Sequence, residues 1–333
     1  MNEYCATHKS KEICRLTNRL VTPGFCKIVC KQRPEKYKKT PLEKFRAHIR
    51  KPLTEEQKCD KDTVSVIIPV GKIDEQYVDR TVQSIRDNAV GSLEILIESD
   101  KEHEGHRVLT NRMAAKAKGK YLLRIDAHSA MSEGWDARMK DSCGPTTLLT
   151  PVIDALDPET WTGRGRDMSM VTLTRTMQNT YPMFDRSIPD RDVEEETMSI
   201  LGCTYMIQKD YYWHHGGCEE ALGVWGAGGL EWVLKVWLTG GIVKVRTDTV
   251  CCHLFRDDGK TPFDIDIVRL NKTFVELGNR WRSGLGKGQT RSLVWLEQKF
   301  SKYLNHIVQW AGRNNRDVFP VEVRQKLQGV PSQ

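Results

Sequence analysis

Short apolar runs of strand length recur through the first half of the chain, and the first begins near residue 63. Residues 63–70 (Thr-Val-Ser-Val-Ile-Ile-Pro-Val) form an almost unbroken run with a proline near its end. Residues 93–97 and 121–125 repeat the pattern. Runs of this length, bounded by turn-forming residues, predict strands that are buried on both faces.

Helical spacing separates these runs. Val78, Val82 and Ile85 recur at i, i+4 and i+7, and Asp74 precedes them where a helix cap is expected. A second helical pattern spans residues 107–118. The resulting β-α-β-α-β order predicts a parallel, right-handed, Rossmann-like α/β sheet. No G-x-G-x-x-G follows the first run, which disfavours a dinucleotide-binding fold.

The third run ends in the polar tip Asp126-Ala127-His128. Ligands of open α/β sheets bind outside the carboxyl ends of the strands. Asp126 and His128 are two residues apart, so on an extended backbone both side chains point the same way. A carboxylate and an imidazole placed in this way can hold a divalent cation. The alternative is that Asp126 only caps the turn that follows.

Composition is that of a soluble globular protein. The chain has 333 residues, of which 29% are charged and 39% hydrophobic, enough for one large α/β domain with additions at its ends. No apolar run approaches the roughly 18–20 residues that cross a bilayer. The first residues lack the apolar core of a signal peptide. These features predict a cytoplasmic location.

Charge is segregated along the chain. Residues 1–62 carry 16 Lys/Arg against 8 Asp/Glu, and residues 279–333 carry 10 against 3, so both ends are basic. The residues between them carry a net charge of −8. Basic ends flanking an acidic middle favour contact with a polyanion such as DNA, although no known nucleic-acid motif accompanies them.

Cysteine is concentrated at the N-terminus. Cys5, His8, Cys14, Cys26 and Cys30 lie within the first 30 residues. Their C-x2-H and C-x3-C spacings are similar to paired half-sites for tetrahedral zinc, although the long gap matches no standard zinc finger. A segment with so few large apolar residues needs a staple to fold. Free thiols, disulfides or another metal are the alternatives to a structural Zn²⁺.

Six short motifs occur in a fixed order over residues 63–260: Asp126-Ala127-His128, Pro151-Val152-Ile153-Asp154, Gly216-Gly217, Trp225-Gly226 with Leu230-Glu231, Trp237-Leu238-Thr239-Gly240-Gly241, and His253-Leu254-Phe255-Arg256. Together they resemble a GT-A glycosyltransferase of the family 2 type. The closest resemblance is to the polypeptide N-acetylgalactosaminyltransferase catalytic domain, without its lectin domain and membrane anchor.

The resemblance implies a domain plan. Residues 1–62 would be a basic Cys/His-rich element and linker. Residues 63–265 would be the GT-A domain, with a nucleotide-binding half at 63–136 and an acceptor half at 137–265. Residues 266–333 would form a basic helical extension. Helical periodicity after residue 291 indicates that the extension packs on the catalytic domain.

The resemblance also implies a set of site residues. Asp126, His128 and His253 would hold Mn²⁺, or Mg²⁺, on the diphosphate of a UDP-sugar; nitrogen ligands favour Mn²⁺. Asp100 would contact uridine, and Arg107 or Asn111 the ribose or diphosphate. The remaining residues predicted to contact the donor are Pro69, Val70, Glu98 and Arg256.

One departure from the family pattern concerns the catalytic base. Gly228-Gly229 stands where the family has an acidic pair. Either transfer retains configuration and the leaving phosphate takes the acceptor proton, or a base comes from Glu231, Glu220 or Asp258. Glu231, Asp258 and Trp225 form the predicted catalytic set. We also expect the two glycines to widen the acceptor pocket.

These observations predict a metal-dependent glycosyltransferase that uses a UDP-sugar and retains configuration. The basic ends favour a modified base in DNA as the acceptor, of the kind found in viral genomes, which would place a viral enzyme in the host cytoplasm. A cell-surface glycan or a protein is the alternative acceptor. A catalytically inactive GT-A protein that binds nucleic acid is the alternative function.

Overall fold

The computed structural model describes residues 62–169, 171–173, 177, 179–180, 184–185, 192–256, 263 and 267–301, and two short strands near the N-terminus. The chain divides into two compact units, Met1–Arg46 and Ala47–Gln333. In the first, β1 (Ile13–Cys14) pairs antiparallel with β2 (Arg19–Leu20). Four members of the predicted zinc set, Cys5, His8, Cys26 and Cys30, and the side chain of Cys14 lie outside the described residues.

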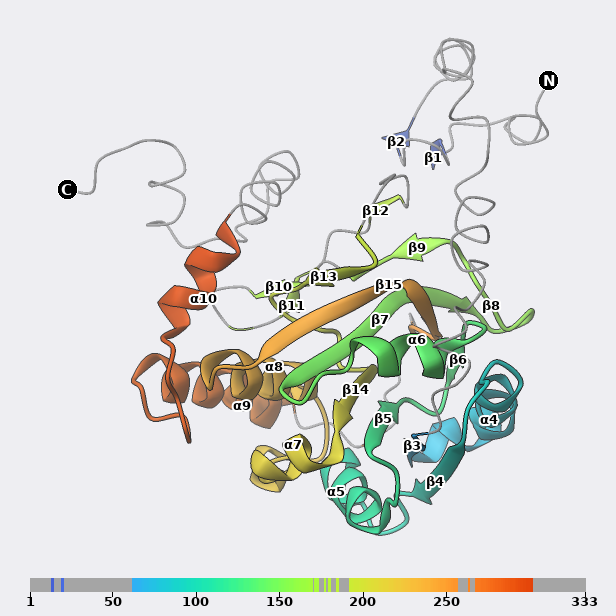
Figure 1. The fold of residues 1–333 in the computed structure, drawn as a ribbon, viewed down its shortest axis with the longest axis horizontal. Coiled ribbons are helices and arrows are strands. Elements are labelled where there is room, and N and C mark those ends of the chain that lie inside the picture. The colour runs from blue at the N-terminus through green and yellow to red at the C-terminus, as the bar shows by residue number, and fades with distance from the viewer. Residues whose placement is uncertain are drawn as a thin grey trace. The chain divides into compact units, whose positions relative to one another are not determined.

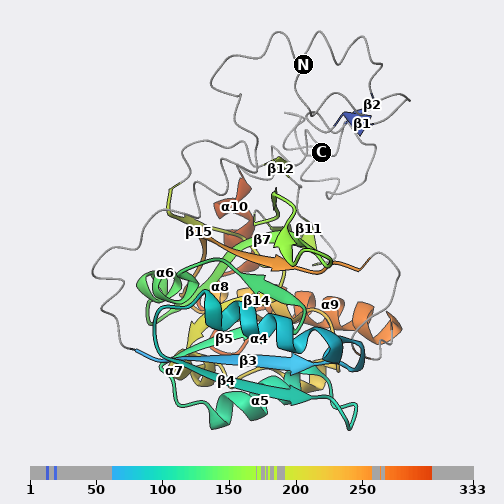
Figure 2. The same ribbon diagram turned by 90° about the vertical axis from the view of Figure 1, so that its right-hand side faces the viewer.

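The second unit is built on a nine-stranded sheet with helices on both faces (Figures 1 and 2). Its first half contains β3 (Val64–Val70), flanked by β4 (Leu93–Ser99) and β5 (Tyr121–Ile125), and both pairings are parallel. The connections are α4 (Val78–Asp87), preceded by the 3-10 segment η2 (Lys72–Tyr77), and α5 (His106–Lys116). The predicted β-α-β-α-β unit is therefore confirmed.

The second half of the sheet mixes strand directions. β14 (Thr204–Gln208) runs antiparallel between β5 and β7 (Thr147–Asp157). β15 (Ile242–His253) is parallel to β7, and β6 (Ser129–Met131) and β13 (Glu194–Glu196) pair antiparallel with β15. β8 (Thr162–Gly163) pairs antiparallel with β7 in this sheet. Four short strands form two separate two-stranded sheets: β9 (Arg166–Asp167) with β12 (Phe184–Asp185), and β10 (Thr172–Leu173) with β11 (Asn179–Thr180).

Alternating side chains of the central strand face two separate cores. Ile67 of β3 belongs to one apolar cluster, with Leu109 of α5, whereas Val66 and Ile68 belong to the other, with Ile85 of α4. Because neighbouring strand residues point to opposite faces, both faces of β3 are buried. The near-continuous apolar run in the sequence has this origin.

The remaining helices cover the same two faces. α6 (Trp135–Ser142) contributes Trp135 to the cluster of α4. The opposite face is covered by α7 (Lys209–His214), η3 (Glu220–Leu222), α8 (Gly228–Leu238), α9 (Ile267–Arg282) and α10 (Leu293–Lys299). Leu277, Leu293 and Phe300 lie in the same cluster as α8, so these two C-terminal helices pack on the domain. Partly buried Trp295 packs there as well, with its ring 6.0 Å from that of Trp237.

The prediction that Asp74 caps a helix is wrong. α4 begins at Val78 and has no side-chain cap, and Asp74 lies within η2. Its side chain is only 2% exposed and contacts His128 and Arg256.

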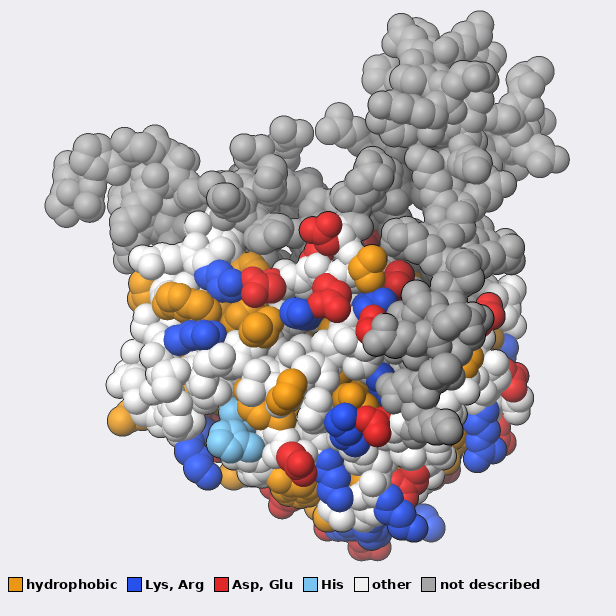
Figure 3. Space-filling model, in the orientation of Figure 1, with side chains coloured by type: hydrophobic (Ala, Val, Ile, Leu, Met, Phe, Trp, Pro, Cys, Tyr) orange, Lys and Arg blue, Asp and Glu red, His pale blue; other side chains and the backbone are white. Residues whose placement is uncertain are grey.

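No helix in the described part of the chain is long and apolar enough to span a bilayer. On the face in Figure 3, acidic and basic side chains are interspersed over the described surface.

Candidate metal and nucleotide site

Three potential metal ligands converge where β5 ends and β15 ends. Asp126 and His128 follow β5, and His253 closes β15. One ligand atom of each lies within 4.8 Å of the others. The His128 Nε2 and His253 Nε2 atoms are 3.0 Å apart, and His253 Nε2 lies 3.1 Å from Asp126 Oδ2. Backbone pairing fixes this approach, since the Leu254 amide donates to the His128 carbonyl at 3.1 Å.

The protonation states of Asp126 and His253 suit metal ligation. Burial alone would raise the pKa of the Asp126 carboxyl, but nearby Arg124, helped by the two histidines, holds that pKa well below its usual range. Burial lowers the pKa of His253, and its bond to Asp126 only partly offsets this effect. An anionic carboxylate beside a neutral imidazole is the donor set that a divalent metal requires.

Two residues that sequence reasoning missed support these ligands. Arg124 Nη1 forms an ion pair with Asp126 Oδ1 at 2.6 Å, and the other oxygen, Oδ2, lies 3.1 Å from His253 Nε2. Asp74 Oδ1 lies 3.0 Å from His128 Nδ1 and also accepts from Arg256. The charged side chain of Arg124 in an otherwise apolar strand, two residues before Asp126, was the available signal. Nothing in the sequence indicated Asp74.

Comparison with known proteins identifies the fold. No known family profile matches the chain. The structure of GalNAc-T7 with UDP, GalNAc and Mn²⁺ superposes with a TM-score of 0.59 at 17% identity, covering 74% of this chain and 58% of that one. Staphylococcus aureus TarS (residues 1–349) with UDP-GlcNAc gives a TM-score of 0.50 at 12% identity, covering 79% and 77%. The chain has the GT-A fold.

A sequence relative agrees with this assignment. The GT-A chain is 25% identical over 233 residues to polypeptide N-acetylgalactosaminyltransferase 5 of Caenorhabditis elegans. The match covers 65% of this chain, which spans only 33% of that relative. The resemblance found in the motifs is therefore present in the sequence alignment and in the fold.

Arg107 is occupied by contacts inside the GT-A domain. Its side chain is 1% exposed and pairs with Glu231, with 3.0 Å between Arg107 Nε and Glu231 Oε2. The two terminal nitrogens donate to the carbonyl oxygens of Gly223 at 2.8 Å and Gly226 at 2.6 Å. These contacts fix the loop before α8, and they disfavour the predicted direct contact between Arg107 and a nucleotide.

Glu231 is equally committed. Its Oε1 accepts from Lys235 at 2.7 Å and from the Glu219 amide at 2.6 Å. Burial would raise its pKa, but Lys235 and Arg107 outweigh burial and lower it. A buried carboxylate with both oxygens engaged is a poor proton acceptor for a substrate hydroxyl. The structure therefore disfavours Glu231 as the base.

Asn111 uses all its hydrogen-bonding capacity within the domain. Its Oδ1 accepts from Tyr212 at 2.6 Å and from the Cys218 amide at 2.8 Å. Its Nδ2 donates to the Cys218 carbonyl at 2.9 Å and to Glu220 at 2.8 Å. Asn111 thus ties α5 to the turn after α7. Glu220 is exposed and takes part in the same network.

The other predicted donor contacts lie at the carboxyl edge of β3 and β4. Pro69 and buried Val70 end β3, and the Val70 carbonyl accepts from the Asp100 amide at 2.8 Å. The Asp100 carboxylate accepts from the amides of Glu104 at 2.8 Å and Gly105 at 3.1 Å, which orders the entrance to α5. Glu98 pairs with Arg112.

The remaining predicted catalytic residues have different settings. Trp225 is partly buried against the core beside α8. Arg256 holds Asp74, as described above. Asp258 lies outside the described residues.

The glycine pair has a packing role that pocket widening does not explain. A Cβ added at Gly229 would lie 2.5 Å from the Ile200 carbonyl oxygen and 3.1 Å from the Gly202 amide nitrogen. Gly229 therefore permits close approach of two backbones, and the expected widening of the pocket at this residue is wrong. A Cβ on Gly228 would lie 3.3 Å from the buried His106 ring.

The pKa of His106 is well below its usual range, because the ring is buried and because Arg107 and Arg124 lie nearby.

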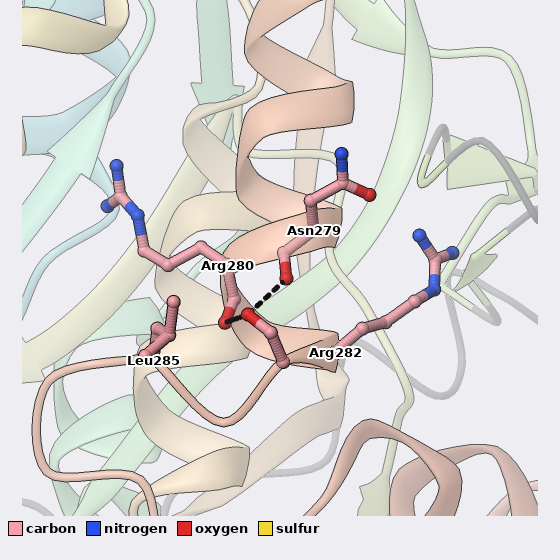
Figure 4. Close-up of a pocket in the computed structure, with 5 residues that line it drawn as sticks. Asn279, Arg280, Arg282 and Leu285 are labelled. Carbon is pink, nitrogen blue, oxygen red and sulfur yellow. Dashed lines mark hydrogen bonds between the residues drawn. The ribbon is translucent and has the colours of Figure 1, made fainter.

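A surface hollow lies at the C-terminal end of α9 (Figure 4). It is a shallow hollow, largely open to solvent, with a volume of about 650 Å³, and it is lined by Asn279, Arg280, Arg282, Ser283 and Leu285. Arg280 is already paired with Glu219 at 2.6 Å, and Ser283 donates to backbone carbonyls of its own helix. This hollow shares no residue with the cluster at Asp126, His128 and His253.

Proposed function

We propose that the chain is a metal-dependent glycosyltransferase that moves a sugar from a UDP-sugar to an acceptor hydroxyl. The observation that carries the proposal is the convergence of Asp126, His128 and His253 at the carboxyl edge of a GT-A sheet. One carboxylate oxygen and two imidazole nitrogens suit Mn²⁺ better than Mg²⁺. A bound ion would neutralise the leaving diphosphate as a Lewis acid.

Two similar proteins support the class of donor. The GalNAc-T7 structure holds UDP, GalNAc and Mn²⁺, and the TarS structure holds UDP-GlcNAc. In this chain Asp100, Glu98 and Val70 lie at the edge where the nucleotide of such a donor would bind. Arg256, near the metal ligands, supplies positive charge for the diphosphate.

The proposed transfer retains configuration. Gly229 leaves no room for the acidic side chain that an inverting relative uses as base, and Glu231 has both oxygens committed. In a retaining transfer the acceptor oxygen bonds to the anomeric carbon on the face that the diphosphate leaves. The departing phosphate oxygen takes the acceptor proton, so no protein carboxylate is required.

The proposed acceptor is a hydroxylated base in DNA, and its support is charge alone. Residues 1–62 and 279–333 carry net charges of +8 and +7, in contrast to the mixed charges on the surface in Figure 3. Such ends favour a polyanionic acceptor over a neutral glycan or a protein. Binding of unmodified duplex DNA tests this part of the proposal separately, because DNA binding can be measured without any sugar transfer. Zinc binding by the N-terminal Cys/His set stays a prediction.

A screen of UDP-sugars tests the central proposal. Thermal stability and UDP release are measured for each donor with Mn²⁺ and with EDTA. Stabilisation that depends on Mn²⁺, with slow hydrolysis of one donor, is the expected result and identifies the sugar. If no nucleotide sugar has an effect while DNA still binds, the chain is a non-catalytic GT-A protein that binds nucleic acid.

A further inference from the structure

The two histidines of the cluster differ in what their outer nitrogens contact. His128 Nδ1 lies 3.0 Å from the Asp74 carboxylate and 3.4 Å from Arg256 Nη2. His253 Nδ1 is buried and has no hydrogen-bond partner among the residues that the structure describes. An imidazole whose outer nitrogen donates to a carboxylate is fixed in orientation and tautomer, and it is a more basic metal ligand. In the described part of the chain, only the outer nitrogen of His128 has a carboxylate oxygen within 3.0 Å.

The side chain of Asp74 contacts His128 and Arg256. It lies in η2, immediately after β3, and is 2% exposed. The oxygen that faces His128 also accepts from Arg256, whose side chain is 14% exposed. Burying a carboxylate is unfavourable unless cationic or hydrogen-bonding partners compensate. Here the partners are one predicted metal ligand and one residue predicted to contact the donor.

We propose that Asp74 is a positioning residue of the metal site. It holds the proton of His128 on Nδ1, so that the lone pair of Nε2 points at the cation, and it keeps Arg256 beside the site through the same oxygen. This inference rests on the proposed function, since it takes Asp126, His128 and His253 as the ligands of the metal. It adds a fourth residue, which lies 52 positions before Asp126 and contacts no ligand atom of the cation.

Two substitutions separate the parts of this role. Asp74→Ala removes the acceptor for the His128 proton and leaves the imidazole free to rotate and to change tautomer. Asp74→Asn keeps the size and one carbonyl oxygen, so the tautomer is retained while the negative charge is lost. Loss of an outer-shell partner typically lowers metal affinity by about 10–100-fold. We expect the alanine variant at the upper end of this range and the asparagine variant at the lower end.

The experiment has two readouts. Mn²⁺ affinity without nucleotide is measured by EPR of the free ion. The His128 tautomer is measured in the metal-free protein by ¹⁵N chemical shifts of the histidine side chains, assigned with His128→Gln. The expected result is an Nδ1–H tautomer in the wild type and in Asp74→Asn, and a mixture in Asp74→Ala.

Asp136→Asn is the matched control. Asp136 is also a fully buried aspartate, but it accepts from the amides of Val90 at 3.0 Å and Gly91 at 2.8 Å, away from the cluster. This variant should lose stability while keeping wild-type Mn²⁺ affinity and tautomer. A control that loses Mn²⁺ affinity as strongly as Asp74→Ala would reduce Asp74 to a general stability effect and overturn the proposal.

The outcomes distinguish this inference from the proposed function. Wild-type Mn²⁺ affinity in Asp74→Ala, or an unchanged tautomer, would overturn the role of Asp74 while leaving the metal site standing. If Asp74→Ala does not fold, wild-type affinity in Asp74→Asn overturns it equally. A wild-type protein that binds no Mn²⁺ would instead overturn the proposed function, and the tautomer would still report whether Asp74 holds the His128 proton.

Discussion

Two arginine–carboxylate pairs, each with a buried arginine, lie in the same domain and have opposite consequences. Arg124 contacts Asp126 at 2.6 Å, and Arg107 contacts Glu231 at 3.0 Å. The Asp126 side chain is 22% exposed and directs its second oxygen at two histidines. The Glu231 side chain is 1% exposed, and its second oxygen is held by Lys235 and a backbone amide.

The difference shows that a motif carboxylate can bind a ligand only if one of its oxygens is not taken up by contacts within the protein. Both residues belong to motifs that resemble the same family, and both have a lowered pKa. Only Asp126 keeps an oxygen directed at other potential metal ligands. We therefore expect ligand binding at the Arg124–Asp126 pair and structural stabilisation from the Arg107–Glu231 pair.

Asp126→Asn should give the largest effect. Loss of an outer-shell partner lowers metal affinity by about 10–100-fold, so loss of a ligand should lower Mn²⁺-dependent UDP binding by more than about 100-fold. Asparagine is preferred to alanine because it leaves Arg124, 8% exposed, with a hydrogen-bond acceptor. Isothermal titration of UDP with Mn²⁺ measures the loss. Asp157→Asn, at the end of β7, is the control, and an equal loss there would contradict the assignment.

Glu231→Ala should mainly destabilise the fold. Removing one partner of a buried ion pair typically costs about 3–5 kcal/mol, because the remaining charge is left uncompensated. Urea unfolding measures the change in the free energy of unfolding. Glu220→Ala, which truncates an exposed carboxylate in the same region, should cost far less. If the Glu231→Ala protein is stable and binds UDP and Mn²⁺ but no longer releases UDP from the UDP-sugar, Glu231 is catalytic instead.

The pH dependence of stability should give the smallest effect. The pKa of Glu231 is lower in the folded protein than its ordinary value of 4.5. Its ionised form therefore stabilises the fold above pH 4.5, and this contribution is lost as the pH falls through the folded pKa. Each tenfold change in proton affinity corresponds to about 1.4 kcal/mol. The free energy of unfolding is measured between pH 3 and 7 for Glu231→Gln and for wild type. It should fall less steeply with acid in the variant, and identical slopes would contradict this prediction.

The sheet was predictable because its strands are buried on both faces. The predicted run 63–70 corresponds to β3 at Val64–Val70, and 121–125 coincides with β5. Burial on both faces makes almost every residue of such a strand apolar, so the pattern is visible without any alignment. The convergence of His253 with Asp126 required the family resemblance, since 127 positions separate them.

The contacts of Asp74, Arg107 and Asn111 were not predictable from local patterns. Asp74 has the position of a helix cap in the sequence, and only the folded chain brings Arg256 to it across 182 positions. Arg107 and Asn111 are polar residues of a helix near the predicted nucleotide site, so a ligand contact was a reasonable hypothesis. Their partners lie between residues 212 and 231, and no spacing rule connects these segments.

The ladder between β6 and β15 gives a bound cation a mechanical consequence. It pairs Ser129 with His253, so an ion shared by His128 and His253 would be a reversible crosslink across that ladder. At a free ion concentration of 100 times the dissociation constant, such a crosslink adds about 2.7 kcal/mol to the free energy of unfolding. The Leu254 amide, which donates to the His128 carbonyl at 3.1 Å, would exchange its hydrogen more slowly in the metal-bound protein.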